Sequence, residues 1–186
     1  MPILGTIASS YAQVTGAYDF IEKKTISGSS TNSITFSSLP TNYRHLQIRA
    51  MARNSRTSTN GPNWMYFNGD NATNYRAPFL YSNGDTTSTG SGFSTADPGL
   101  GISAAGNTAG SNQFGVSTTT ILDYRGSTYK SVLSVGGFNN QDTGDHLSAI
   151  NNGIWLNTAA ITSITFQAFT NPLVAGSVFV LYGIKG

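Results

Sequence analysis

The sequence predicts an all-β protein, and three observations support this fold class. Residues 44–53 alternate between apolar and polar side chains, a period of two that places one face of a strand in a core and the other outside it. Asn-Gly-Asp sequences at 68–70 and 83–85 are signals for tight turns between strands. No stretch keeps a helical period of 3.6 residues for more than two turns.

The first 17 residues predict an extended N-terminal arm rather than part of the sandwich. They carry no charge, and their apolar side chains could yield roughly 1.5–3 kcal/mol each on burial. Ordering the backbone costs roughly 1–2 kcal/mol per residue, so the arm must lie along its own domain or dock on another chain. Its expected partner-binding residues are Ile3, Leu4, Ile7, Tyr11 and Val14.

Residues 18–186 predict one β-sandwich domain built from nine strands and one further candidate. The strand at 33–38 alternates apolar with hydroxyl residues, and Leu39-Pro40 ends it. The tetrapeptide Ser-Ile-Thr-Phe at 33–36 recurs at 163–166, which we interpret as coincidence rather than an internal repeat. The expected strands are 19–26, 33–38, 44–53, 64–68, 75–82, 114–124, 129–136, 161–170 and 176–184, with 147–156 as the further candidate.

Residues 83–113 differ in composition from the rest of the chain. They are mostly Gly, Ser, Thr, Ala and Asn, with Phe93, Leu100 and Ile102 as the sizeable apolar side chains. Such a segment inside a β domain predicts a long surface excursion. Excursions on a rigid scaffold often carry function, and a loop without function is an equally weighted interpretation.

The overall composition limits the class of protein. Of 186 residues, only 10% are charged and 11% are aromatic, whereas about 25% of an average soluble domain is charged. The net charge of +2 is too small to predict general nucleic-acid binding. There is no cysteine, which excludes disulfides and thiolate metal sites and fits synthesis in a reducing cytoplasm.

Neither a membrane span nor a secretion signal is expected. The longest apolar run near the end, 178–182, is far shorter than the roughly 20 residues that a spanning helix needs. The first ten residues hold no positive charge and too short an apolar block for a secretion signal. We therefore expect no membrane partner.

Residues for catalysis or metal binding are scarce. The single glutamate, Glu22, lies beside two lysines, and most aspartates lie in turns. Both histidines, His45 and His146, fit surface polar residues better than catalytic bases. Asp142, Asp145 and His146 form an oxygen-rich cluster that could hold calcium, but Asp-Thr-Gly-Asp is an ordinary turn sequence. We expect no catalytic residues, no metal site and no cofactor.

A basic strand is the stronger candidate for a binding site. Arg44, His45, Arg49, Arg53 and Arg56 follow one another without an acidic residue. Because His45, Arg49 and Arg53 share strand parity, they line one face at intervals of about 13 Å. The face either is solvated and paired with aspartates or forms a positive patch for an acidic protein surface. Nucleic acid ranks behind both, since lysines and closely interleaved aromatic residues are missing.

Aromatic side chains gather in several segments. They occupy 64–67, 75–81, Tyr124 and Tyr129. Such residues form either a sugar-stacking groove or the packed core of a sandwich, and we favour the core.

Short motifs in a fixed order, over almost the whole chain, carry a resemblance. The motifs are Pro-Ile-Leu-Gly-Thr-Ile-Ala-Ser-Ser at 2–10, Thr-Phe-Ser-Ser-Leu-Pro at 35–40, Tyr-Arg-His-Leu-Gln-Ile-Arg at 43–49, Phe-Asn-Gly-Asp at 67–70, Ile-Leu-Asp-Tyr at 121–124, Ile-Thr-Ser-Ile-Thr-Phe at 161–166 after Trp155, and Leu-Tyr-Gly-Ile-Lys at 181–185 after Gly176. In this order and spacing the chain resembles a family of small virion proteins of tailed bacteriophages, common in phages of aquatic bacteria including cyanobacteria. The resemblance implies a jelly-roll-like β-sandwich displayed on the particle, often as a trimer, with no catalytic residues to carry over. It leaves 83–113 unmatched and does not separate head from tail.

Two function hypotheses follow for a jelly-roll sandwich with such an arm. The first is a capsid decoration (cement) protein on the outer surface of the virion, assembled in the host cytoplasm, whose arm lies over the major capsid protein. Its sandwich forms a homotrimer, so that three arms act together. The alternative is a tail- or head-fibre, receptor-binding protein whose 83–113 segment and tyrosines bind a host-surface glycan. A glycan-degrading enzyme would need two carboxylates about 5–9.5 Å apart, and we expect no enzyme.

Overall fold

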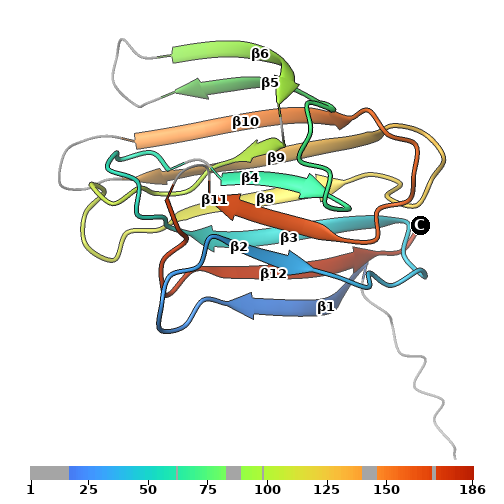
Figure 1. Ribbon diagram of the computed structural model, residues 1–186, viewed down its shortest axis with the longest axis horizontal. Coiled ribbons are helices and arrows are strands. Elements are labelled where there is room, and N and C mark those ends of the chain that lie inside the picture. Colours follow the sequence, from blue (N-terminus) through green and yellow to red (C-terminus); the bar gives the residue numbers. More distant parts are fainter. Residues whose placement is uncertain (1–16, 62, 83–88, 98, 140–145, 169–170) are drawn as a thin grey trace, which may run out of the picture.

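The chain folds into two antiparallel β-sheets that pack face to face (Figure 1). The computed structural model describes residues 17–61, 63–82, 89–97, 99–139, 146–168 and 171–186, and within these ranges there is no helix. The predicted fold class, an all-β sandwich, is confirmed. The strands are β1 (Tyr18–Thr25), β2 (Ser33–Phe36), β3 (His45–Ala52), β4 (Asn63–Phe67), β5 (Tyr75–Ser82), β6 (Thr89–Asp97), β7 (Leu100–Ile102), β8 (Gly115–Ile121), β9 (Lys130–Asn139), β10 (His146–Trp155), β11 (Ile164–Ala168) and β12 (Val178–Ile184).

The two sheets differ in width. The large sheet has eight strands in the order β1-β12-β3-β8-β9-β10-β5-β6, and the small sheet has four in the order β2-β11-β4-β7. In β12 the side chains that face the other sheet, among them Phe179 and Leu181, are buried and alternate with partly exposed ones. The period of two in the sequence thus corresponds to the two faces of each sheet.

Eight of the strands form a jelly roll. If β5, β6, β9 and β10 are left out, the first strand pairs with the last, β1 with β12, and the next pairs inward are β2–β11, β3–β8 and β4–β7. This is the pairing of a long hairpin rolled over itself, in which consecutive strands alternate between the two sheets. The pairs β12–β3 and β11–β4 complete the sheets.

Two hairpins are inserted into this jelly roll, and both widen the large sheet only. The hairpin β5–β6 lies between β4 and β7 in sequence, and β9–β10 lies between β8 and β11. The edge strand β7 of the small sheet contacts β9, β10 and β5. Gly153 on β10 permits this close packing, since a Cβ there would lie 2.2 Å from Leu100 Cδ2. Strands β5 and β6 form one end of the large sheet, and in Figure 1 they lie above the labelled strands of the small sheet, β2, β4 and β11.

Aromatic rings form the centre of the core between the sheets. Phe166 on β11 and Phe179 on β12 join the two sheets with ring centroids 4.9 Å apart. Trp155 packs on Phe67 at 5.5 Å and stacks on Tyr75 at 6.4 Å. Each of these side chains is at most 1% exposed, and burial of such rings is the largest contribution that single residues make to a core.

The repeated Ser-Ile-Thr-Phe tetrapeptides lie side by side in the small sheet. Strand β2 pairs with β11 so that Thr35 faces Thr165, and their hydroxyl oxygens are 2.9 Å apart. Phe36 and Phe166 make an edge-on ring contact at 6.3 Å. The repetition follows from two neighbouring strands that share the same buried and exposed faces.

Each of the ten predicted strand regions overlaps a strand of the structure. Part of the expected surface excursion at 83–113 belongs to the two sheets. Residues 89–97 form β6, and the side chains of Leu100 and Ile102 on β7 are 3% and 1% exposed. Ala104 and Ala105 are fully buried. Small residues concealed this core segment, because they carry little of the hydrophobic alternation that marks a strand.

Candidate binding surfaces

The basic strand does not form one exposed row of charges. Arg49 points away from the core and is exposed, whereas His45 is half-buried and Arg53 is only 9% exposed. His45 Nδ1 accepts a hydrogen bond from the backbone N–H of Asp123 at 2.9 Å. The expectation that Arg53 shares an exposed face with His45 and Arg49 is therefore wrong, because the chain leaves β3 at Ala52.

Arg53 holds a loop together instead of meeting a partner. Its guanidinium donates to the carbonyl oxygens of Gly110 at 2.6 Å and of Asn107, Ala109 and Gln113 at 2.9 Å each. Burial lowers the pKa of Arg53, yet a guanidinium stays charged in proteins. One buried cation thus satisfies four carbonyls of a loop that has no strand partner of its own.

Arg49 is the arginine of β3 that lies exposed on the outside of the large sheet. Its guanidinium carbon lies 5.6 Å from the ring centroid of Tyr18 and 5.0 Å from that of Tyr182. Its Nε donates to Gln47 Oε1 at 3.0 Å. The side chain is therefore held in place by ring faces and one hydrogen bond, and its charge remains exposed.

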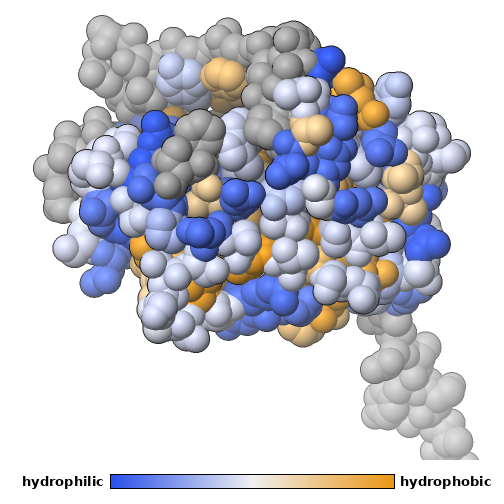
Figure 2. Space-filling model, viewed as in Figure 1, coloured by the Kyte–Doolittle hydropathy of each residue, from blue (hydrophilic) through white to orange (hydrophobic). Residues whose placement is uncertain are grey.

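The outer face of the large sheet, the side away from the small sheet, exposes a broad apolar surface. Across neighbouring strands Val135 lies opposite Ile150, and Ile150 lies opposite Leu80. Exposed apolar patches beyond a few hundred Å² mark interaction sites in soluble proteins. Large apolar and aromatic side chains on this face that are 40–59% exposed include Tyr18, Met51, Leu80, Val116, Leu133, Val135 and Ile150. The opposite side of the molecule, over the small sheet, presents mainly polar residues (Figure 2).

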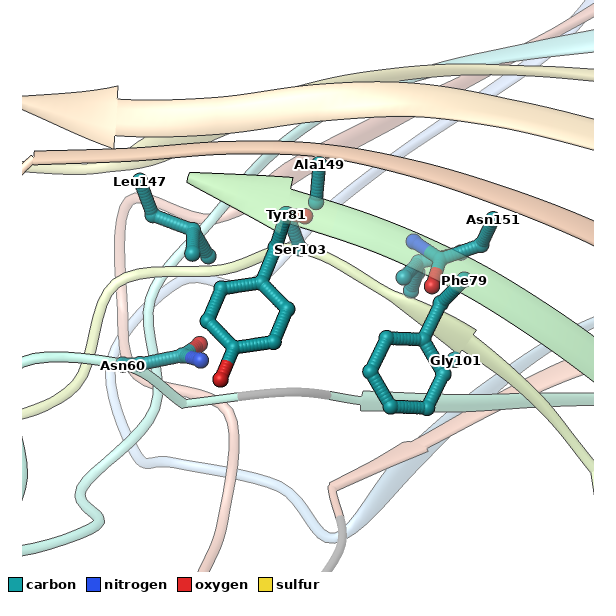
Figure 3. Close-up of a pocket in the computed structure, with 9 residues that line it drawn as sticks. Asn60, Phe79, Tyr81, Gly101, Ser103, Leu147, Ala149 and Asn151 are labelled. Carbon is teal, nitrogen blue, oxygen red and sulfur yellow. The ribbon is translucent and has the colours of Figure 1, made fainter. Parts of the chain in front are cut away.

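A groove opens where β5 extends beyond the small sheet. Its first cavity has a volume of about 280 Å³ and lies between the inner side of β5 and β10 and the residues of β7. The rings of Phe79 and Tyr81 project from β5 to the same side (Figure 3), with centroids 6.0 Å apart and planes at 30°. Both side chains remain 36% exposed, although they point to the core side of the sheet.

A second, more polar cavity continues the groove. It has a volume of about 320 Å³ and is lined by Ser58, Thr59, Asn60 and His146, together with Tyr81. Tyr81, Asn60 and Leu147 line both cavities. Asn60 Oδ1 and His146 Nδ1 are buried atoms without a hydrogen-bond partner in the described part of the chain. The groove therefore combines an aromatic wall with unused hydrogen-bonding groups.

The aromatic residues divide between core and groove. Tyr75 and Tyr124 are fully buried, as the core interpretation predicted, whereas Tyr129 is exposed. Sequence reasoning named the segment 75–81 but did not separate its residues. The sequence Phe79-Leu80-Tyr81 could have indicated a surface site, because three large apolar residues in a row place apolar side chains on both faces of a strand. Nothing in the sequence around Asn60 indicated a binding residue, because only the fold brings Asn60 to the groove.

The acidic side chains near these surfaces serve structure. Asp70 Oδ2 accepts from Trp155 Nε1 at 2.7 Å, and its carboxylate accepts two bonds from Asn74 at 3.0 and 3.1 Å. Burial alone would raise the pKa of Asp70, but the hydrogen bonds from Trp155, Asn74 and the Ala72 N–H lower it below its ordinary value. Asp70 therefore fixes a turn to the core.

The remaining predicted site residues stand as follows. The arm residues Ile3 to Val14, and Asp142 and Asp145, lie outside the described residues. His146 begins β10. In the ranges that the structure describes, no group of three or more His, Asp or Glu is placed to hold a metal ion, and no helix is long and apolar enough to cross a membrane.

The topology defines the chain as an all-β sandwich protein of the jelly-roll type, widened by two inserted hairpins. No protein-family model, no curated protein and no solved structure matches it.

Proposed function

We propose that this protein is a bacteriophage virion structural protein, a capsid decoration (cement) protein that binds the major capsid protein and stabilises the shell as a homotrimer. Such a role needs rigid, specific contacts and no chemistry. A jelly roll with few charges supports it, as do the motifs that resemble small virion proteins. The arm, with Ile3, Leu4, Ile7, Tyr11 and Val14, supplies the contact with the shell, and Arg49 supplies positive charge for an acidic partner.

The outer face of the large sheet is the observation that carries this proposal. Eight strands about 4.8 Å apart and seven residues of about 3.3 Å give a face of about 34 by 23 Å, close to the roughly 800 Å² that each partner of a standard interface buries. Its centre, around Val116, Val135 and Ile150, carries no charge. A second copy that covers this centre buries no charge there. Arg49 lies in the same row, two strands from Val135, so the surface that covers the whole face needs an acidic group opposite it. In a closed ring of three copies, the outer face of each copy contacts a different surface of the next copy.

Self-association tests the face directly. We expect the purified protein to be a trimer by light scattering, and Val135→Asp, which puts a charge at the centre of the face, to be a folded monomer. Gln167→Asp is the matched control, because it adds the same charge to an exposed position on the small sheet and should remain trimeric. A wild-type protein that stays monomeric at about 100 μM, well above the concentrations at which standard interfaces form, contradicts the interface.

Shell binding tests the arm. We expect the protein to cosediment with empty expanded capsids and to lose this binding when residues 1–17 are deleted. Cosedimentation that is unchanged by the deletion would contradict the role of the arm.

A second candidate function is a fibre or receptor-binding protein that recognises a host-surface glycan. The groove beside Phe79 and Tyr81 favours it. Binding to host cells at wild-type strength after deletion of residues 1–17, without binding to capsids, would select this candidate over decoration.

A further inference from the structure

We propose that the groove between β5 and β7 is a binding site for a neutral pyranose sugar, with Phe79 and Tyr81 as the stacking platform. The proposal goes beyond the decoration role, which needs no small ligand. For the receptor-binding candidate it names the site and the class of ligand. It depends on the groove and not on the outer face of the large sheet.

The aromatic wall is the first argument. In a two-layer sandwich, large side chains that point to the core side of a sheet are normally covered by the other sheet. Phe79 and Tyr81 point inward from β5, but the small sheet ends at β7, so both rings stay 36% exposed in a cavity of about 280 Å³. Their planes differ by 30°, which gives an extended apolar wall. The C–H face of a pyranose ring packs on such a wall.

The polar groups at the end of this wall are the second argument. Asn60 Oδ1 and His146 Nδ1 are buried and have no hydrogen-bond partner within the described ranges. Buried polar atoms without partners are rare in native proteins, and each one calls for an explanation. A rotation of the Asn60 amide turns an acceptor or a donor toward the cavity. Sugar hydroxyls both donate and accept, so they match an amide, an imidazole and the hydroxyls of Ser58 and Ser103.

The volume of the groove and the charge of its lining residues restrict the class of ligand further. Cavities of about 280 and 320 Å³ that share Tyr81 and Asn60 form a site in the range of about 300–1,000 Å³ typical of small-molecule pockets. Among the described residues that line the two cavities there is no Asp, Glu, Lys or Arg. Apart from the imidazole of His146, a phosphate, sulfate or carboxylate would find no cationic partner among them. The groove therefore suits a neutral hexopyranose at a chain end or branch.

The probe is a glycan array of neutral hexopyranose di- and trisaccharides, followed by titration calorimetry with the strongest binder. We expect Phe79→Ala and Tyr81→Ala each to weaken binding about tenfold or more, because each removes a stacking ring, and Asn60→Ala to weaken it as well. Tyr129→Ala is the matched control. It removes an exposed tyrosine ring (53% exposed) that does not line either cavity, and it should leave the affinity unchanged.

Three outcomes overturn the proposal. One is that no neutral hexopyranoside binds at millimolar concentration. Another is that binding survives both ring substitutions in variants whose circular dichroism and melting temperature match the wild type. The third is capture of an extended peptide, paired with the open edge of β7, in place of any sugar. The light-scattering result for Val135→Asp is independent of all three, so failure of the groove and failure of the outer-face interface are distinguishable.

Discussion

Replacing Arg53 by alanine removes a buried cation that connects one loop to the end of β3. Two of its four hydrogen bonds, to Ala109 and Gly110, are buried, and a hydrogen bond to a charged donor contributes about 1.5–3 kcal/mol. The other two, to Asn107 and Gln113, are partly exposed, so water can replace the donor. We expect a loss of about 3–6 kcal/mol in the free energy of unfolding, which for a chain of this size lowers the melting temperature by at least about 6 °C.

Urea denaturation followed by tryptophan fluorescence measures this loss, and Arg49→Ala is its matched control. Arg49 is exposed and contacts two tyrosine rings, so its removal should cost about 1 kcal/mol or less. Arg53→Lys should fall between the wild type and Arg53→Ala, since an ammonium has three donors and cannot span four carbonyls. If Arg53→Ala unfolds within about 1 kcal/mol of the wild type, the buried bonds do not contribute as argued.

Three further substitutions test other buried polar groups. Because the pKa of Asp70 is lowered in the folded protein, its carboxylate stabilises the fold above about pH 4, and this contribution is lost as pH falls through the folded-state pKa. Asp70→Asn removes the carboxylate, so the variant should lose less stability between neutral and acidic pH than the wild type does. Melting temperatures from pH 2 to 7 with an equal loss in both proteins would contradict this. Lys130→Met, which leaves three backbone carbonyls without the ammonium donor, should destabilise the protein by about 2–4 kcal/mol in urea. An unchanged midpoint would show that the ammonium contributes nothing. Tyr75→Phe removes the hydroxyl that accepts from the Phe67 N–H at 2.9 Å, and calorimetry should show a loss of about 1–3 kcal/mol unless water enters.

Strands were predictable where apolar and polar side chains alternate clearly in the sequence. Strand β3 alternates between buried and exposed positions from Ile48 to Ala52, so a period of two identified it. Strand β8 buries Ser117 and Thr119 and exposes Val116, so its sequence shows no such hydrophobic alternation. Strand β7 could not be found in this way, because it has three residues and is surrounded by Gly, Ser and Ala. Its place in the core depends on packing against Gly153, a contact between segments that are distant in sequence.

The candidate sites were less predictable than the strands. The odd or even position of a residue shows which face of a sheet its side chain occupies, but only within the strand itself. Arg49 and Arg53 have the same parity, but β3 ends at Ala52, and the loop at 107–113 closes over Arg53. The groove depends on the width of one sheet relative to the other, which is a property of the topology and leaves no local pattern. Asn60 and His146 meet there from segments more than 80 residues apart.

Strand β5 takes part in both proposed surfaces, and its geometry lets them work together. Leu80 belongs to the outer face, whereas Phe79 and Tyr81 line the groove on the inner side. Where the surface that meets the outer face lies away from the groove, several grooves on one assembly gain avidity for a multivalent glycan. A trimeric wild type should then bind a densely printed sugar surface more tightly than monomeric Val135→Asp does. Both should bind a single free disaccharide equally, and a difference there would mean that the outer face and the groove are coupled.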